Sequence, residues 1–155
     1  MNKSALVIGA VSACLISGSA YADSDYFRPV TNEVTLEECS ACHMAFQPAF
    51  LPMRSWKAIM ADLPNHFGED ASLDEASRQE IEDYLVTYAG DALGRNRDVT
   101  RLSAGKTPLR ITELYWWLDE HDADEVSKRA WDRAGSKANC TACHRDAESG
   151  YYDDD

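Results

Sequence analysis

Apolar residues recur at three- and four-residue steps in several parts of the chain, which is the spacing of one face of an α-helix. The clearest such stripe lies between Pro52 and Pro64 and consists of Met53, Trp56, Met60 and Leu63. No stretch alternates apolar and polar residues with the period of two that marks a half-buried strand. The sequence therefore predicts a mainly α-helical protein.

Two capping boxes predict where further helices begin, because in this motif a Ser or Thr is followed three residues later by Glu or Gln. Thr35 and Glu38 form the first box, so a helix should begin just ahead of the first pair of cysteines. Ser72 and Glu75 form the second, and that helix should run to about residue 89. Its predicted buried face consists of Ile81, Tyr84, Leu85 and Tyr88.

The apolar pattern is weaker in the second half of the chain. A helical segment is expected after Pro108, or from a later start capped by Thr112, and it should end near His121. Its apolar positions are Ile111, Leu114, Tyr115 and Leu118. The adjacent Trp116 and Trp117 either fill the core or pack on a bound group. A short amphipathic helix is expected over residues 124–134.

Residues 1–22 have the pattern of a secretory signal rather than of a folded element. Lys3 supplies the positive start, residues 5–16 are apolar, and Ala20-Tyr21-Ala22 matches the small-x-small cleavage pattern. The apolar run is too short to span a membrane. Cleavage after Ala22 would place the mature protein in the bacterial periplasm, with no membrane span.

An alternative interpretation makes Val11-Ser12-Ala13-Cys14 a lipoprotein cleavage site that anchors the protein through Cys14. The signal would then be unusually short. Cleavage after Ala22 is favoured because it removes Cys14, and the four cysteines that remain then all belong to one type of motif.

The mature chain, residues 23–155, has the length of one compact domain. Within it we expect a first half over about 23–90 and a second half over about 108–150. The stretch between them, about 90–107, loses the helical spacing and gains Gly, Asn and Arg, which is typical of a linker. Residues 151–155 form an acidic tail that should fray.

The protein is strongly acidic. It has 15 Lys and Arg against 27 Asp and Glu, and loss of Lys3 with the signal leaves 14 against 27, a formal net charge of -13. Such a surface disfavours nucleic acid and anionic lipid as partners and favours a protein with a basic patch. The alternative is that the charge only keeps the protein in solution, and composition alone does not separate the two.

The chain carries the motif C-x-x-C-H twice, as Cys39-Ser40-Ala41-Cys42-His43 and as Cys140-Thr141-Ala142-Cys143-His144. This is the signature of covalent c-type haem attachment. On a helical turn two residues three apart share a face, so the two thiols can meet the two vinyl groups on one edge of a porphyrin. The adjacent histidine then lies under the ring as the proximal iron ligand. We therefore predict two haem c groups, one in each half of the mature chain.

Other uses of a C-x-x-C pair remain as alternatives. A zinc half-site or a thioredoxin-like redox pair would use the thiols but give the adjacent histidines no role. Two disulfides are a further alternative in an oxidising compartment. Cysteines at this spacing would close very small loops and constrain the unfolded chain little. Haem accounts best for both motifs.

The histidines outside the motifs match the number of haems. Of the four histidines, His66 lies 23 residues after His43, and His121 lies 23 residues before His144. A lone histidine is more often a surface or packed residue than a ligand, but here none is left over. We predict that His66 lies opposite His43 on haem 1 and His121 opposite His144 on haem 2, with a crossed pairing as the alternative. Methionine is the other candidate for an axial ligand, and the chain offers Met44, Met53 and Met60. The helical spacing of Met53 and Met60 assigns these two to the core instead.

Together these residues resemble the small bacterial dihaem cytochrome c family. The stretches that carry the resemblance are Cys39–Met44, Leu51–Trp56, His66–Leu73, Arg110–Thr112 and Ser136–His144. The resemblance extends over nearly the whole mature chain. The resemblance implies bis-histidine coordination at both haems, with His66 and His121 as the remaining ligands, and a role as an electron donor. The implied partners are an oxygen-binding monohaem cytochrome, a membrane cytochrome b, or both.

Electron transfer is the function that these residues favour, because an iron with all six positions filled has no site for a substrate. The alternatives are a dihaem enzyme, which needs an open or displaceable ligand, and a gas sensor, which would release His66 or His121. The chain is short for the enzyme, and we find no output domain for the sensor. No acid, base or nucleophile constellation appears apart from the haem ligands, so we expect a carrier with no catalytic residues.

Overall fold

The computed structural model describes residues 26–92 and 96–152. The predicted signal peptide, its cleavage site and Cys14 therefore lie outside the described residues. In chain order the helices are α1 (Glu33–Cys39), α2 (Met53–Met60), α3 (Glu75–Thr87), α4 (Arg97–Thr100), α5 (Tyr115–Glu120) and α6 (Lys128–Ala134). Short 3₁₀ segments span Pro48–Phe50, Leu63–Asn65, Ile111–Glu113, Cys140–Ala142 and Ala147–Ser149.

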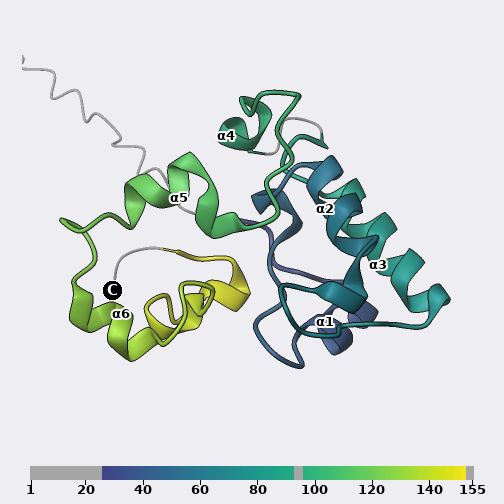
Figure 1. The fold of residues 1–155 in the computed structure, drawn as a ribbon, viewed down its shortest axis with the longest axis horizontal. Helices are drawn as coiled ribbons and strands as arrows, with labels where there is room; N and C mark the ends of the chain where they lie inside the picture. Colours follow the sequence, from purple (N-terminus) through teal and green to yellow (C-terminus); the bar gives the residue numbers. More distant parts are fainter. Residues whose placement is uncertain (1–25, 93–95, 153–155) are drawn as a thin grey trace, which may run out of the picture.

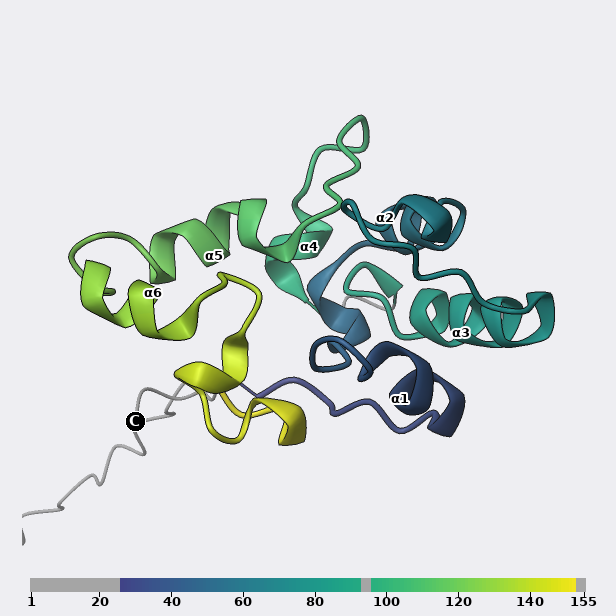
Figure 2. The same cartoon turned by 60° about the horizontal axis from the view of Figure 1, so that its bottom comes forward.

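Within the described residues the structure has no strand, only two isolated bridges, which join Tyr26 to Tyr151 and His66 to Glu69. The predicted mainly α-helical class is confirmed. Two lobes are visible in Figure 1 and again after rotation in Figure 2: one holds α1, α2 and α3, and the other holds α5, α6 and the C-terminal segment.

The apolar core begins where α2 packs against α3 and extends into the second lobe. Its buried members include Trp56, Met60, Ile81, Leu85, Leu114 and Trp117. Met53 does not belong to it, because its side chain is 39% exposed at the start of α2. The two lobes therefore share one core rather than two.

The first helix begins earlier than its capping box predicted. Its N-cap is Asn32, whose Oδ1 accepts hydrogen bonds from the N–H of Thr35 at 2.7 Å and from the hydroxyl of Thr35 at 2.8 Å. Thr35 itself is buried in the first turn. Asn is as favourable at an N-cap as Ser or Thr. Asn32 therefore caps the helix one turn before the predicted capping box of Thr35 and Glu38.

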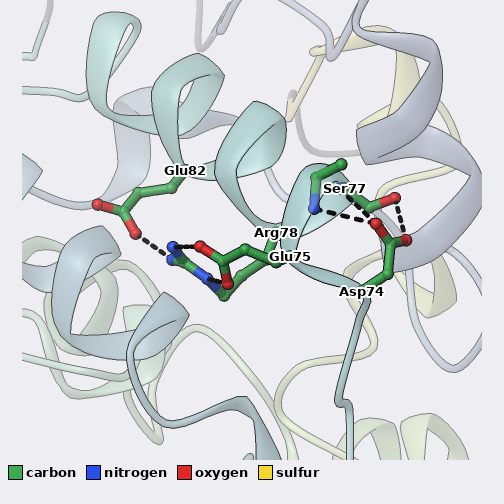
Figure 3. Close-up of polar contacts among 6 residues, drawn as sticks. Asp74, Glu75, Ser77, Arg78 and Glu82 are labelled. Carbon is green, nitrogen blue, oxygen red and sulfur yellow. Dashed lines mark hydrogen bonds and ion pairs between the residues drawn. The ribbon is translucent and has the colours of Figure 1, made fainter.

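The third helix also has a different cap from the one predicted. Asp74, not Ser72, is its N-cap, and the Asp74 carboxylate accepts hydrogen bonds from the N–H groups of Ala76 and Ser77 and from the Ser77 hydroxyl. Figure 3 shows this cap beside a second cluster, in which Arg78 pairs with Glu75 and Glu82. The helix ends at Thr87, close to the predicted end.

The predicted linker contains a short helix and a buried side chain that its polar sequence did not indicate. Val99 of α4 is 1% exposed and packs against Gly90. At Gly90 a Cβ would overlap the Ala49 carbonyl oxygen, so only glycine fits there. Asn96 secures the segment, because its Nδ2 donates to the Ala49 carbonyl at 3.2 Å. A single buried apolar side chain, that of Val99, creates no periodic apolar pattern in a polar stretch of sequence.

The segment after Pro108 is not one continuous helix. A 3₁₀ turn is followed by an extended residue, Leu114, and only then by α5. This break rotates the buried face onto Leu114 and Trp117, whereas Tyr115 is 76% exposed and Leu118 48% exposed. The predicted apolar face was therefore wrong at Tyr115 and Leu118. Further along, α6 starts at Lys128, inside the predicted range, with Ser127 as its N-cap.

The end of the chain is anchored rather than frayed, at least as far as Tyr152. The Phe27 N–H donates to the Gly150 carbonyl at 2.8 Å, and the Tyr152 hydroxyl donates to Gln47 Oε1 at 2.6 Å. Gln47, which is fully buried, also donates from Nε2 to the Ala147 carbonyl at 2.7 Å. These bonds fold the second lobe back onto the first. Residues 153–155 lie outside the described residues.

In the ranges 26–92 and 96–152, none of the helices combines the length and the apolar character needed to cross a membrane.

Replacement of Asp74 by Ala should lower the melting temperature at neutral pH. The hydrogen bond from the Ser77 hydroxyl and that from the Ser77 N–H hold the pKa of the Asp74 carboxyl below its ordinary value. A carboxyl whose pKa falls on folding stabilises the fold above its unfolded pKa of about 4 and loses that effect as the pH drops. The melting temperatures of wild type and variant, measured across pH, should therefore converge in acid.

Asp83→Ala, on the exposed face of the same helix, is the matched control and should change the melting temperature little. A difference between wild type and Asp74→Ala that stayed constant down to acid pH would contradict the cap assignment.

Candidate functional site

The first C-x-x-C-H motif lies where α1 ends. Cys39 is the last residue of the helix and is partly buried, and Cys42 on the following turn is exposed. The His43 Nδ1 lies 2.7 Å from the Met44 carbonyl oxygen. Because a carbonyl can only accept, Nδ1 carries the proton and donates it, which leaves Nε2 with a lone pair for a metal.

His66 comes directly after the 3₁₀ turn that follows α2, in a tight turn. The His66 N–H donates to the Glu69 carbonyl at 2.8 Å, and the Glu69 N–H returns a bond to His66 at 3.1 Å. Phe67, at the tip of this turn, has a positive φ of 57°, which is uncommon for a residue with a Cβ. The turn brings the ring centroid of His66 to 6.2 Å from that of His43, with the planes inclined by 26°.

The second motif lies on a 3₁₀ turn, Cys140–Ala142, in the C-terminal part of the second lobe. His144 follows it, and the His144 ring centroid lies 6.0 Å from that of His121 with the planes inclined by 71°. His121 is the C-cap of α5. Its Nδ1 donates to the Trp117 carbonyl at 2.9 Å, so Nε2 is again left with its lone pair.

The two ring separations suit a metal ion between each pair. Metal–imidazole bonds are about 2.0 Å long, so two imidazoles on opposite sides of one metal have centroids roughly 6 Å apart. The structure thus brings His43 to His66 and His121 to His144, and it leaves each pair at that spacing.

A cavity of about 510 Å³ opens beside the first pair. The walls contributed by the first lobe are mostly apolar and include Leu51, Trp56, Ile59, Met60, Leu63 and Leu85. Cys39, Cys42, His43 and His66 all reach it, as a covalently attached porphyrin would require. Trp117 and Cys140 of the second lobe also line this cavity, so the two candidate haem sites adjoin.

An unsatisfied donor supports the presence of a further group. The indole Nε1–H of Trp116 is buried and has no acceptor among the described residues. Buried donors in native proteins almost always have a partner, so an acceptor from outside the polypeptide is expected here.

The environment of the cysteines does not favour zinc binding. Burial raises the pKa of the Cys39 thiol to about 11, with a further contribution from Glu38, and burial raises the pKa of Cys140 to about 11. A metal is bound by the thiolate, which these apolar surroundings disfavour. In the part of the chain that the structure describes, no three His, Cys, Asp or Glu side chains gather around a common point, and the four cysteines form no disulfide.

The surroundings of His66 favour its neutral form, which is the form that binds a metal. Burial lowers the pKa of the His66 imidazole most, and the neighbouring His43 and the charge of Arg110 lower it further. A neutral imidazole has the free lone pair that binds a metal.

Sequence reasoning missed several residues that pack around the second histidines. Phe67 and Arg110 lie beside His66, and Lys137 and Trp131 lie near His121. The weak signal was the aromatic and basic character of residues close to a histidine in the sequence. Trp117, for which the sequence left two roles open, fills the core and also stacks on His121 at 4.2 Å with an interplanar angle of 5°.

Several known proteins resemble this chain in sequence and structure. The family model for dihaem cytochrome c matches residues 35–152. A dihaem cytochrome c from Rhodobacter sphaeroides is 58% identical, with a TM-score of 0.76, and the match covers 80% of this chain and 98% of that one. A dihaem cytochrome type c from Shewanella baltica is 36% identical, with a TM-score of 0.64, and the match covers 79% and 87%. No curated protein sequence matches.

Proposed function

Because the chain belongs to the dihaem cytochrome c family, and so uses two covalently attached haem c groups for electron transfer, we propose that both irons are held between two histidines. His43 and His66 would bind the iron of haem 1, and His144 and His121 that of haem 2. The observation that carries this proposal is the pair of ring separations, 6.2 Å and 6.0 Å, each of which suits one metal ion.

The residues around each haem would attach it, orient its ligands and keep water away. Cys39 and Cys42 would form the thioethers of haem 1, and Cys140 and Cys143 those of haem 2. The Met44 and Trp117 carbonyls fix the tautomer and ring orientation of His43 and His121. When bound, each haem supplies an iron that takes up and releases one electron. Two histidine ligands favour a lower potential than a Met/His pair, because methionine raises it.

A carrier is favoured over a dihaem enzyme or a gas sensor because neither pair of histidines leaves room for a substrate. The ring centroids of each pair are already at the separation expected for two imidazoles bound to one metal ion. Two backbone hydrogen bonds between His66 and Glu69 also hold the turn that carries His66. An enzyme or sensor would need one of these rings to swing away.

Carbon monoxide binding tests this assignment. The fully reduced wild-type protein should not change its optical spectrum on titration with carbon monoxide, because all axial positions are filled. His66→Ala and His121→Ala should each open one iron, so that about half of the haem binds the gas. A pyridine haemochrome assay should still find two haems per chain in both variants.

Asn65→Ala and Asp119→Ala change exposed neighbours of the two histidines and should remain inert to carbon monoxide. A wild-type protein that bound the gas would favour the enzyme or the sensor. A histidine variant that stayed inert would show that another residue is the ligand.

We also propose that the protein is exported to the periplasm by the signal over residues 1–22. In cells that express the full sequence with the machinery for c-type haem attachment, mass spectrometry of the periplasmic fraction should find a mature chain that begins at Asp23. A mature chain that begins at a lipid-modified Cys14 would contradict cleavage after Ala22 and support the lipoprotein.

The acidic surface supports a partner with a basic docking face, which we propose is an oxygen-binding monohaem cytochrome, a membrane cytochrome b, or both. The net charge of -12 for the whole chain attracts such a partner over several ångströms and accelerates encounter.

Ionic strength should therefore control the rate of electron transfer. In stopped-flow measurements, the rate constant for oxidation of the reduced protein by a basic monohaem cytochrome c should fall as salt is added, because salt screens the attraction. With an acidic acceptor the rate constant should instead rise. A rate constant that did not depend on salt would contradict electrostatic docking.

A further inference from the structure

A cation and the second histidine of haem 1 contact the same aromatic ring. The guanidinium carbon of Arg110 lies 4.0 Å from the ring centroid of Phe67. Phe67 in turn packs edge-on against His66, with ring centroids 4.8 Å apart and planes inclined by 62°. Arg110 is therefore close to His66 and shares Phe67 with it.

A similar arrangement recurs at haem 2 with different residues. The Lys137 Nζ lies 5.4 Å from the ring centroid of Trp117 and 5.8 Å from that of Trp131. Both indoles contact His121: Trp117 stacks on it at 4.2 Å, and the Trp131 centroid lies 6.0 Å away. Two unrelated segments thus bring a cation and a candidate iron-binding histidine to a shared aromatic ring.

From this recurrence we infer that Arg110 and Lys137 raise the reduction potentials of haem 1 and haem 2 respectively, each acting from beside an aromatic ring that it shares with the histidine. The inference rests on the proposed histidine pairing. Ferric haem carries one more positive charge than ferrous haem, so a nearby cation disfavours the ferric state. The rings replace part of the water around each cation, but Phe67 is 44% exposed, the Arg110 side chain is 49% exposed and Lys137 is exposed, so solvent screens part of each charge and the shifts in potential should be modest.

The rest of the protein explains what these two cations would offset. The chain is acidic overall, with a formal net charge of -12, and this favours ferric iron at both sites. Glu69 and Asp70 line the cavity of haem 1 together with Arg110. The acidic surroundings lower the reduction potentials of both haems. The positive charges of Arg110 and Lys137 would offset part of that decrease.

The two cations differ in how strongly they are neutralised. Arg110 Nε lies 3.6 Å from Glu113 Oε1, with both side chains about half exposed, so this ion pair is weak but removes part of the charge. Lys137 forms no ion pair with a carboxylate of the described residues. Replacement of Glu113 should therefore shift the potential of haem 1 in the direction opposite to replacement of Arg110, because it leaves the charge of Arg110 without its partner.

The two haems can be followed separately. Their proposed axial imidazole planes are inclined by 26° in one pair and by 71° in the other, and the g-values of low-spin ferric haem depend on this angle. Electron paramagnetic resonance of samples poised along a redox titration should therefore report the midpoint potential of each haem.

Replacement of Arg110 by Gln should lower the midpoint potential of haem 1 and leave that of haem 2 nearly unchanged. Lys137→Gln should have the reverse selectivity, and Glu113→Gln should raise the potential of haem 1. Arg110→Lys and Lys137→Arg keep the charge and should keep the potentials. Lys128→Gln removes an exposed cation that pairs with Asp132, and it is the control for net charge.

Three results would overturn the inference: unchanged potentials in both Gln variants, equal shifts of the two haems, or charge-keeping variants that shift as far as the Gln variants. The last result would mean that the rings and cations act only by packing. Failure of histidine ligation would appear separately, as carbon monoxide binding by the wild-type protein or as a His66→Ala or His121→Ala variant that stays inert to the gas, whatever the potentials of the variants.

Discussion

Two pairs of imidazole rings, each about 6 Å apart, set the constraint that the rest of the structure must meet. In each pair, one histidine directly follows a pair of cysteines, and the other lies in a different element of the chain. The helices are short, from four to thirteen residues, and helices of this length are marginal by themselves in water. Their order therefore depends on packing around the two haem sites and the one shared core.

The shared core explains why the two halves form one unit. Leu114 and Trp117 of the second lobe are buried against residues of α2 and α3, and the buried side chain of Gln47 ties the C-terminal segment back to the first lobe. The polypeptide alone leaves a large cavity beside this core. A porphyrin in that cavity would supply the apolar volume that a chain of this size and polarity does not provide.

The features that were predicted from sequence are those that repeat or have a fixed spacing. The helical class followed from the apolar period, and the two haem attachment motifs from their spacing; the local pairing of histidines, proposed from their number and order, stays a prediction. The helix caps could not be ranked, because Asn32 and Asp74 compete with Thr35 and Ser72 and only tertiary packing decides between them. The break at Leu114, the burial of Val99 and the packing of Phe67 on His66 depend on contacts between distant residues, which leave no local pattern.

The wall between the haem sites has a consequence for the number of electrons that the protein holds. Trp117 and Cys140 line the cavity of haem 1, while Trp117 also stacks on His121 of the other site. An electron on one haem would therefore repel a second electron arriving at its neighbour, through side chains of low dielectric constant. Such repulsion would separate the two reduction steps and favour a half-reduced form that gives or accepts a single electron.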